Sequence, residues 1–126
     1  MQDLEAAVIA WFVTEFGEDD PELRQQLKAA SIIEREFTSG AGAYLTLDVG
    51  ATPLSRTASR ISCLDGPEIR SSEMSAGALV SIHFVDGRAS SIEIWSCAGD
   101  YPTTEHPKGF SLVEPKTNYV DVRGEL

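Results

Sequence analysis

The sequence predicts an α+β fold in which two N-terminal helices pack on one face of a mainly antiparallel sheet of five to seven strands. Up to residue 30, apolar residues recur every three or four positions, as on the buried side of a helix. From residue 31 onward they alternate with polar residues, and short turn sequences rich in Gly and Asp separate the alternating segments. A chain of 126 residues can bury one core of useful size, so we expect a single domain over residues 1–126, helical in 1–30 and sheet-forming in 31–126.

The first expected helix spans Asp3 to Phe16, and the second begins after Asp20. Asp3 is a suitable N-cap for the first helix, and Gly17 is typical of the position at which a helix ends. Asp20 is a suitable N-cap for the second, because Pro21 then occupies the first helical position, where a backbone N–H is not needed. The expected apolar faces consist of Leu4, Val8, Trp11, Phe12 and Phe16 in the first helix and Leu23, Leu27 and Ala30 in the second.

A hairpin with its turn at Ser39-Gly40-Ala41-Gly42 is predicted next. Its first strand alternates Ile33, Arg35 and Phe37 with Glu34, Glu36 and Thr38, and its second alternates Ala43, Leu45, Leu47 and Val49 with Tyr44, Thr46 and Asp48. One face of this hairpin is therefore expected to be apolar. The following residues, 50–59, are rich in Gly, Ala, Thr, Ser and Pro without any periodicity, and we expect a mobile loop there.

Two further hairpins are expected after this loop. The first joins residues 60–64 to 68–71 through a turn at Asp65-Gly66-Pro67. The second joins residues 78–85 to 88–97 around Asp86-Gly87 and contains the clearest alternation in the chain.

The turn at Asp86-Gly87 decides which side chains of this last hairpin share a face. A two-residue turn would mix apolar and polar side chains on both faces. A three-residue turn over residues 85–87, with Gly87 left-handed in a bulge, keeps the apolar residues together, and we predict it for this reason. The helix-facing side then carries Val80, Ile82, Phe84, Ile92 and Ile94, and the opposite side carries Leu79, Ser81, His83, Glu93, Trp95 and Cys97. Residues 110–113 are expected to form an edge strand, and residues 119–122 either another edge strand or a loosely docked tail.

The sequence carries 10 basic and 20 acidic residues, a net charge of −10 at pH 7. Nucleic acids and anionic membranes bind proteins through clusters of Lys and Arg, and the sequence has no such cluster, so neither is an expected partner. The acidity either serves solubility alone or steers a basic protein or peptide towards the molecule.

The compartment is indicated by the apolar stretches and the cysteines. The longest apolar stretch, residues 6–13, is too short to cross a bilayer, and it follows Asp3 and Glu5 where a signal peptide has basic residues. Cys63 and Cys97 are isolated in sequence, as is typical of reduced thiols. We therefore expect a cytoplasmic protein.

Motifs for catalysis or cofactor binding are not apparent. The sequence has no Gly-x-Ser-x-Gly elbow and no P-loop, and Gly40 and Gly42 lack the third glycine of a dinucleotide-binding turn. Cys63 or Cys97 could pair with His83 as thiol and base, or hold zinc with it, only if residues far apart in sequence converged. We expect no enzyme activity, no cofactor and no metal site.

The polar and aromatic side of the predicted sheet is the candidate functional site, with Tyr44, Asp48, His83, Glu93 and Trp95 as its binding residues. The first hypothesis is a non-enzymatic protein-binding module of the immunity or antitoxin kind, with a basic protein as its partner. The alternative is a small-molecule-binding protein or minor enzyme with a pocket around Glu93, His83 and Trp95. A homodimer formed through the same side is a third hypothesis, compatible with the first.

Four short motifs occur along the sheet-forming part of the chain. They are Arg35-Glu36-Phe37-Thr38 with Gly40-Ala41-Gly42-Ala43-Tyr44, then Ser75-Ala76-Gly77-Ala78, Asp86-Gly87 and Ile92-Glu93-Ile94-Trp95. They resemble a group of small bacterial proteins of unassigned function, whose pattern is F-T-G-x-G-F, a G-A-G strand entry, a D-G hairpin and an L-E-x-Y-T-Y strand before a proline-containing tail. The chain departs from this pattern at Ser39, at Ser75-Ala76 and at Trp95-Ser96-Cys97. The resemblance covers residues 34–113 and implies a small α+β fold, no known activity and no catalytic residues.

Overall fold

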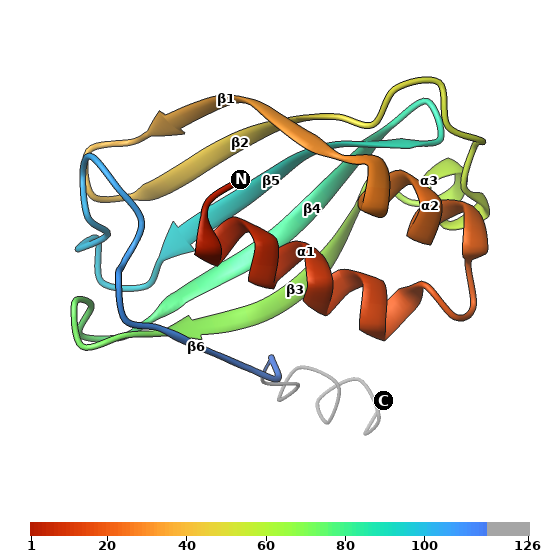
Figure 1. Ribbon diagram of the computed structural model, residues 1–126. Coiled ribbons are helices and arrows are strands. Elements are labelled where there is room, and N and C mark those ends of the chain that lie inside the picture. The colour runs from red at the N-terminus through yellow and green to blue at the C-terminus, as the bar shows by residue number, and fades with distance from the viewer. Residues whose placement is uncertain (116–126) are drawn as a thin grey trace, which may run out of the picture.

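Two helices lie across one face of a six-stranded sheet in the computed structural model, which describes residues 1–115 (Figure 1). The helices are α1 (Asp3–Phe16), α2 (Pro21–Ala29) and the short α3 (Arg56–Arg60). The strands are β1 (Ser31–Phe37), β2 (Gly42–Asp48), β3 (Cys63–Arg70), β4 (Ala78–Val85), β5 (Arg88–Ser96) and β6 (Ser111–Val113). Their order across the sheet is β1-β2-β5-β4-β3-β6, and every neighbouring pair is antiparallel. The predicted α+β class, with two N-terminal helices on one face, is confirmed.

The first helix, α1, is capped by Gln2 and not by Asp3. The backbone N–H of Gln2 donates to Glu5 Oε1 at 3.0 Å, a capping-box bond that places Asp3 inside the first turn. The prediction was wrong because Asp is the commoner N-cap residue, whereas here Glu5 supplies the bond from three positions further along. Gly17 ends the helix as predicted.

Residues 50–59, expected to form a mobile loop, contain part of helix α3. The carboxylate of Asp20 connects the start of this short helix to the start of α2. Its Oδ1 accepts from the Leu23 N–H at 2.9 Å and caps α2 as predicted. Asp20 Oδ2 accepts from Ser55 Oγ at 2.6 Å and from the Thr57 N–H at 3.0 Å, at the start of α3. One carboxylate thus satisfies donors at the N-termini of both helices. Periodicity missed α3 because a five-residue helix is too short for an amphipathic pattern.

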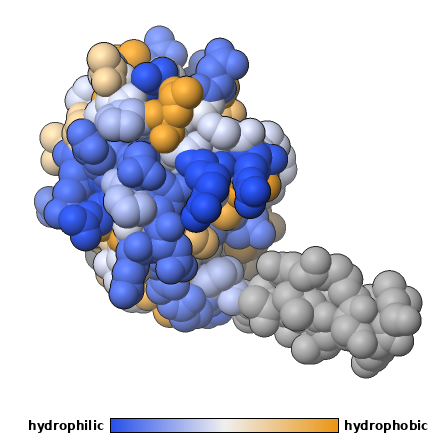
Figure 2. Space-filling model, turned by 90° about the vertical axis from the view of Figure 1, so that its right-hand side faces the viewer, coloured by the Kyte–Doolittle hydropathy of each residue, from blue (hydrophilic) through white to orange (hydrophobic). Residues whose placement is uncertain are grey.

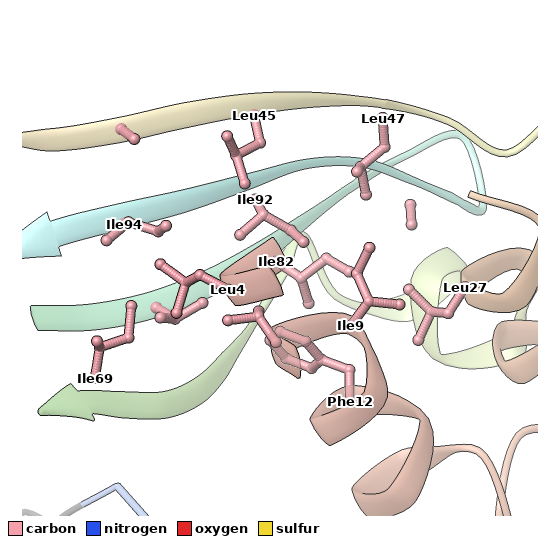
Figure 3. Packing of buried hydrophobic residues seen from close by; sticks show 14 of the residues in the cluster. Leu4, Ile9, Phe12, Leu27, Leu45, Leu47, Ile69, Ile82, Ile92 and Ile94 are labelled. Carbon is pink, nitrogen blue, oxygen red and sulfur yellow. The ribbon is translucent and has the colours of Figure 1, made fainter. Parts of the chain in front are cut away.

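The core fills the space between the helices and the sheet face that they cover (Figure 3). Phe12 of α1 approaches β3 so closely that a Cβ added to Gly66 would lie 2.6 Å from its Cζ atom, so a larger residue there would have to displace the Phe12 ring. The predicted helix-facing residues are each 6% exposed or less: Leu45, Leu47, Val80, Ile82, Phe84, Ile92 and Ile94.

The predicted β1–β2 hairpin is present, but Ile33 does not belong to its apolar face. The pairing shifts between Ile32, opposite Leu47, and Glu34, opposite Thr46, which leaves Ile33 in a β-bulge and 62% exposed. Half-buried Ile32 takes the predicted place of Ile33 against the core. Alternation alone did not reveal the bulge, and a shift of one residue exchanges the two faces of a strand.

Residues 60–64 and 68–71 do not form the predicted hairpin. Residues 63–64 and 68–70 belong to the single strand β3, and Asp65-Gly66-Pro67 forms an irregularity within it, where the pairing with β4 shifts. Gly and Pro favour turns, but they also occur at bulges, where a strand tolerates the missing N–H of Pro67.

The turn between β4 and β5 has two residues, and the prediction of three was wrong. Asp86 and Gly87 have positive φ angles of 51° and 82°, as in a type I′ turn, and Val85 lies opposite Arg88. The extra residue lies further along, where the pairing shifts at Ser90. This bulge restores the parity, so the predicted division of side chains between the two faces is confirmed.

Strand β6 confirms the predicted edge strand at residues 110–113 and pairs with β3. The strand or tail predicted at residues 119–122 lies outside the described residues.

Where α2 and α3 lie, the surface is mostly hydrophilic with isolated hydrophobic side chains (Figure 2).

Candidate binding face

Within residues 1–115, no helix covers the sheet face opposite α1 and α2, which we call the open face (Figure 1). Register places alternate residues of each strand on it. The large apolar side chains exposed there are Val113 (37%), Tyr44 (40%), Leu79 (51%), Val85 (58%) and Trp95 (59%). A group of apolar side chains on one face, unlike scattered single ones, is typical of an interaction surface.

Trp95 and Leu79 form an apolar strip across the two central strands of the open face. They lie directly opposite each other in β5 and β4, and both are more than half exposed. Side chains in such pairs are close enough to contact each other. Trp95 is therefore on the exposed face, where the sequence places it, and Leu79 is its partner in the strip.

Tyr44, Glu93 and His83 lie beside this strip on three adjacent strands. Tyr44 is opposite Glu93, and its hydroxyl donates to Ser91 Oγ at 2.9 Å. His83 Nε2 lies 3.5 Å from Glu93 Oε1 and 3.2 Å from Ser81 Oγ. All of these contacts are partly exposed to water, so they orient the side chains more than they stabilise the fold.

Asp48 lies apart from the other four candidate residues. It is at the far end of β2, opposite Ser31, and its Oδ1 accepts from the backbone N–H of Gly50 at 2.8 Å. This is a local turn contact. The structure thus gathers Tyr44, His83, Glu93 and Trp95 on the open face and places Asp48 at its end.

A hollow of about 260 Å³ lies between Tyr44 and Trp95. Opposite Trp95 on the β2 side is Gly42, which contributes no side chain to cover the indole. The hollow is lined by Glu36, Thr38, Ala41, Ala43, Tyr44, Glu93, Ile94 and Trp95. Pockets for small-molecule ligands usually measure about 300–1,000 Å³, so this hollow suits a smaller group.

A groove of about 410 Å³ borders Leu79 on the other side of the strip. It is lined by Asp65, Gly66, Glu68, Ala76, Leu79, Val80, Cys97 and Pro115. The strip is therefore flanked by a recess on each side. A larger, mostly polar recess of about 710 Å³ lies between residues 68–77 and 109–111, and none of the predicted site residues lines it.

Carboxylates dominate the charge of the open face. They occupy the positions Glu34, Glu36, Asp48, Asp65, Glu68 and Glu93. Two arginines of the same strands are already engaged: Arg70 Nε lies 2.7 Å from Glu68 Oε1, and Arg88 Nε donates to the Thr52 carbonyl at 2.9 Å. The face is therefore negative around an apolar centre.

The cysteines are both exposed and unbridged. Cys63 lies opposite His83, towards the end of β4, whereas the Cys97 N–H bonds the carbonyl of Gly77, just before β4 begins. They are therefore near opposite ends of this strand. Cys63 and His83 are neighbours on the open face, but neither lines any of the three recesses described above.

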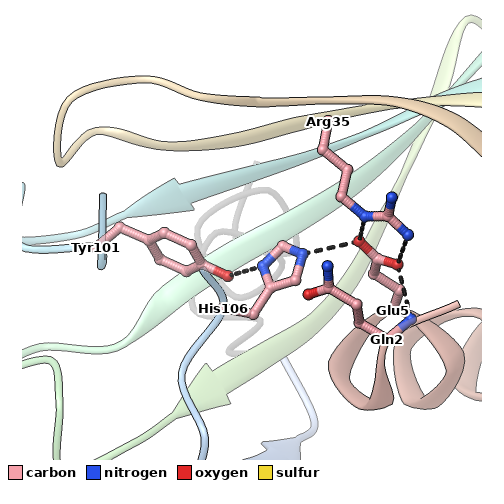
Figure 4. Close-up of polar contacts among 5 residues, drawn as sticks. All are labelled: Gln2, Glu5, Arg35, Tyr101 and His106. Atoms are coloured by element: carbon pink, nitrogen blue, oxygen red, sulfur yellow. Dashed lines mark hydrogen bonds and ion pairs between the residues drawn. The ribbon is translucent and has the colours of Figure 1, made fainter. Parts of the chain in front are cut away.

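A buried polar network lies on the helix side of the sheet, and the sequence did not predict it (Figure 4). The fully buried Glu5 carboxylate accepts from Arg35 Nε at 2.6 Å, from Arg35 Nη2 at 2.8 Å and from His106 Nε2 at 2.9 Å. His106 Nδ1 lies 2.7 Å from the Tyr101 hydroxyl. An ionised carboxylate can only accept hydrogen bonds, so Nε2 of His106 donates in its contact with Glu5.

The charge state of this network follows from its contacts. Burial by itself raises the pKa of Glu5, but hydrogen bonds from Arg35, the Gln2 N–H and His106 outweigh it and lower the pKa to about 2. Burial, together with the negative charge of Glu5, raises the pKa of Tyr101. At neutral pH Glu5 is therefore ionised and Tyr101 protonated, which suits a network that holds the fold together.

Comparisons of the chain with protein-family models, with curated proteins and with solved structures each found no match. None of the helices in residues 1–115 is both long and apolar enough to cross a membrane. In the same residues, no group of three or more His, Cys, Asp or Glu side chains is arranged to hold a metal ion.

Proposed function

We propose that the protein is a non-enzymatic, cytoplasmic binding module that captures a basic protein partner on its open face. The observation that carries this proposal is the strip of Trp95 and Leu79, exposed at the centre of a face rimmed by carboxylates. Protein interfaces commonly have an apolar centre and a polar rim, and Trp is enriched among the residues that contribute most to binding. An immunity or antitoxin protein, which acts by occupying its partner, fits this description.

A basic partner fits the open face better than a second copy of the chain. In a homodimer formed through this face, the carboxylates of both copies, such as Glu36, Glu93 and Asp65, would be brought together and would repel each other. A basic surface pairs with the same carboxylates, and the attraction also speeds association. Two exposed free thiols are compatible with the reducing cytoplasm.

The hollow beside Trp95 lies where the alternative, a small-molecule site around Glu93, His83 and Trp95, is expected. Tyr44, Glu93 and Trp95 line it, but His83, the expected base, does not. Its volume of about 260 Å³ is below the usual range for such sites. We therefore interpret the hollow as a part of the protein-binding surface.

The experiment that tests the proposal is affinity capture from a lysate of the source organism with four folded proteins. They are the wild type and the variants Trp95→Ala, Leu79→Ala and Leu54→Ala. Leu54 is the matched control, because it is as exposed as Leu79 but lies outside the sheet, in the segment before α3. We expect a basic protein to be retained by the wild type and by Leu54→Ala and lost from the other two.

Two results would contradict the proposal. Retention of the same proteins by all four variants would show that binding does not involve the strip. Light scattering at two concentrations that shows a wild-type dimer, abolished by Trp95→Ala, would favour the homodimer. Circular dichroism and urea unfolding of each variant separate lost binding from lost structure.

A further inference from the structure

We infer that the hollow between Tyr44 and Trp95 is a binding site for one cationic side chain, a guanidinium or an ammonium group, presented by the partner. This inference rests on the proposed function and names the chemistry that the open face recognises. The hollow is lined by aromatic rings and by carboxylates. Both kinds of group attract cations, but for different physical reasons.

The register of the strands brings these groups together. Tyr44 lies opposite Glu36 of β1 on one side and opposite Glu93 of β5 on the other. Trp95 is two residues beyond Glu93 on the same strand, so it is on the same face. Glu36 and Glu93 flank Tyr44 on the two neighbouring strands, so their Cβ atoms are about 10 Å apart, and both carboxylates line the hollow together with the two rings.

The two carboxylates have no Lys or Arg partner within the described residues. Among residues 1–115, neither Glu36 nor Glu93 forms an ion pair with Lys or Arg, and the nearest basic group to Glu93 is His83, at 3.5 Å. Their charges are therefore available to a ligand. An apolar ligand in the same hollow would remove these carboxylates from water without compensation, which disfavours it.

The aromatic rings add affinity for the same ligands. The negative face of an indole attracts a cation, and Trp is the strongest of the aromatic side chains in this respect. Trp95 is more than half exposed, so its ring is accessible to such a group. The hollow of about 260 Å³ has room for the end of one side chain.

The test is an NMR titration of the ¹⁵N-labelled protein with three small probes: N-acetyl-arginine methylamide, N-acetyl-lysine methylamide and N-acetyl-citrulline methylamide. Citrulline has nearly the shape of arginine but carries no charge. We expect the arginine or lysine probe to shift the Trp95 indole N–H and the amides of Glu36, Tyr44 and Glu93 in a saturable way. We expect no saturable shift with citrulline.

Substitutions in the hollow show whether the probes bind there. Trp95→Ala and Glu93→Gln should each weaken probe binding by about fivefold or more, since the first removes one of the two rings and the second the charge of one of the two carboxylates. Glu34→Gln is the matched control, because Glu34 is also an open-face carboxylate of β1 but does not line the hollow. It should leave the affinity within about twofold.

The outcomes separate this inference from the proposed function. No saturable shift with either cation up to about 100 mM, or equal shifts with citrulline, would overturn the inference. So would full retention of the partner by a folded Glu36→Gln, Glu93→Gln double variant, while its loss from Leu79→Ala would still support the proposed function. Conversely, a cation site in the hollow together with no basic protein captured by the wild type would overturn the proposed function alone.

Discussion

His106 Nε2 donates to Glu5 Oε2 at 2.9 Å, although the two residues are 101 positions apart in the chain. The same carboxylate is held by Arg35 of β1, so one side chain of α1 connects the first helix, the edge of the sheet and the segment before β6. The contacts of Glu5 thus tie these three segments together on the helix side of the sheet.

Glu5→Gln should destabilise the protein by about 2 kcal/mol, since the buried carboxylate accepts charge-assisted hydrogen bonds from the partly exposed Arg35 and from the buried His106. Arg35 loses its partner, and the amide cannot accept from both Arg35 and His106 as the carboxylate does. Urea unfolding monitored by circular dichroism measures the change. The control Glu34→Gln, on an exposed side chain, should stay within about 0.5 kcal/mol. Equal stability of the two variants would refute the role of the network.

Acid should destabilise the wild type mainly below pH 4.5. In the unfolded chain Glu5 and Asp20 have ordinary pKa values near 4.5 and 3.8, and in the folded protein both are about 2. For Asp20, burial raises the pKa, but hydrogen bonds from Ser55, Leu23 and Thr57 outweigh it. Because folding lowers these pKa values, their contribution is complete above pH 4.5 and is lost as the pH falls towards 2.

The free energy of unfolding, measured in urea at each half unit between pH 2 and pH 6, checks this expectation. Glu5→Gln should show a clearly shallower decline below pH 4.5 than the wild type, because its amide does not titrate. Glu34→Gln should decline as the wild type does. Parallel curves for the wild type and Glu5→Gln would mean that Glu5 has an ordinary pKa in the folded protein.

Asp20→Ala should lower the free energy of unfolding by about 2 kcal/mol, because the carboxylate caps both α2 and α3. Asp19→Ala is the matched control, since Asp19 is exposed and adjacent. Hydrogen exchange gives a local readout: the amides of Thr57 and Ala58 should exchange faster in Asp20→Ala and unchanged in Asp19→Ala. Unaltered protection of these amides would argue that α3 is ordered without Asp20.

Gly66→Ala should destabilise the protein by about 2 kcal/mol through overpacking, because the new Cβ would meet the Phe12 ring at 2.6 Å. Gly109→Ala, at a position with open space around it, is the control. In a Phe12→Leu background the cost of Gly66→Ala should shrink, since the clashing ring atoms are gone. The same cost in both backgrounds would place the strain elsewhere.

The alternation of apolar and polar residues predicted the faces of the central strands. Ile82 and Ile92 face the helices and Trp95 faces away, because a strand has a strict period of two and the core selects the apolar side. The bulges at Ile33 and Ser90 could not be predicted, since an extra residue changes the pairing without a distinct composition. The Ser90 bulge compensated for the error in the turn length.

The polar contacts between segments far apart in the chain could not be predicted from the sequence. Nothing in the residues around Glu5 indicates that His106 and Arg35 will meet it, because their approach depends on the packing of α1 on the finished sheet. One signal was available: Glu5 lies beside Leu4 near the apolar side of the helix, and a carboxylate in that position needs a partner. The hollow at Trp95 likewise depends on which residues the register places beside it.

The central claim, that the open face captures a basic protein, is tested most directly by calorimetric titration of the purified captured partner against the folded wild type, Trp95→Ala and Leu54→Ala. We predict one-to-one binding that weakens with added salt, weakens at least about tenfold in Trp95→Ala and is unchanged in Leu54→Ala. Equal affinity of the wild type and a folded Trp95→Ala would contradict the claim.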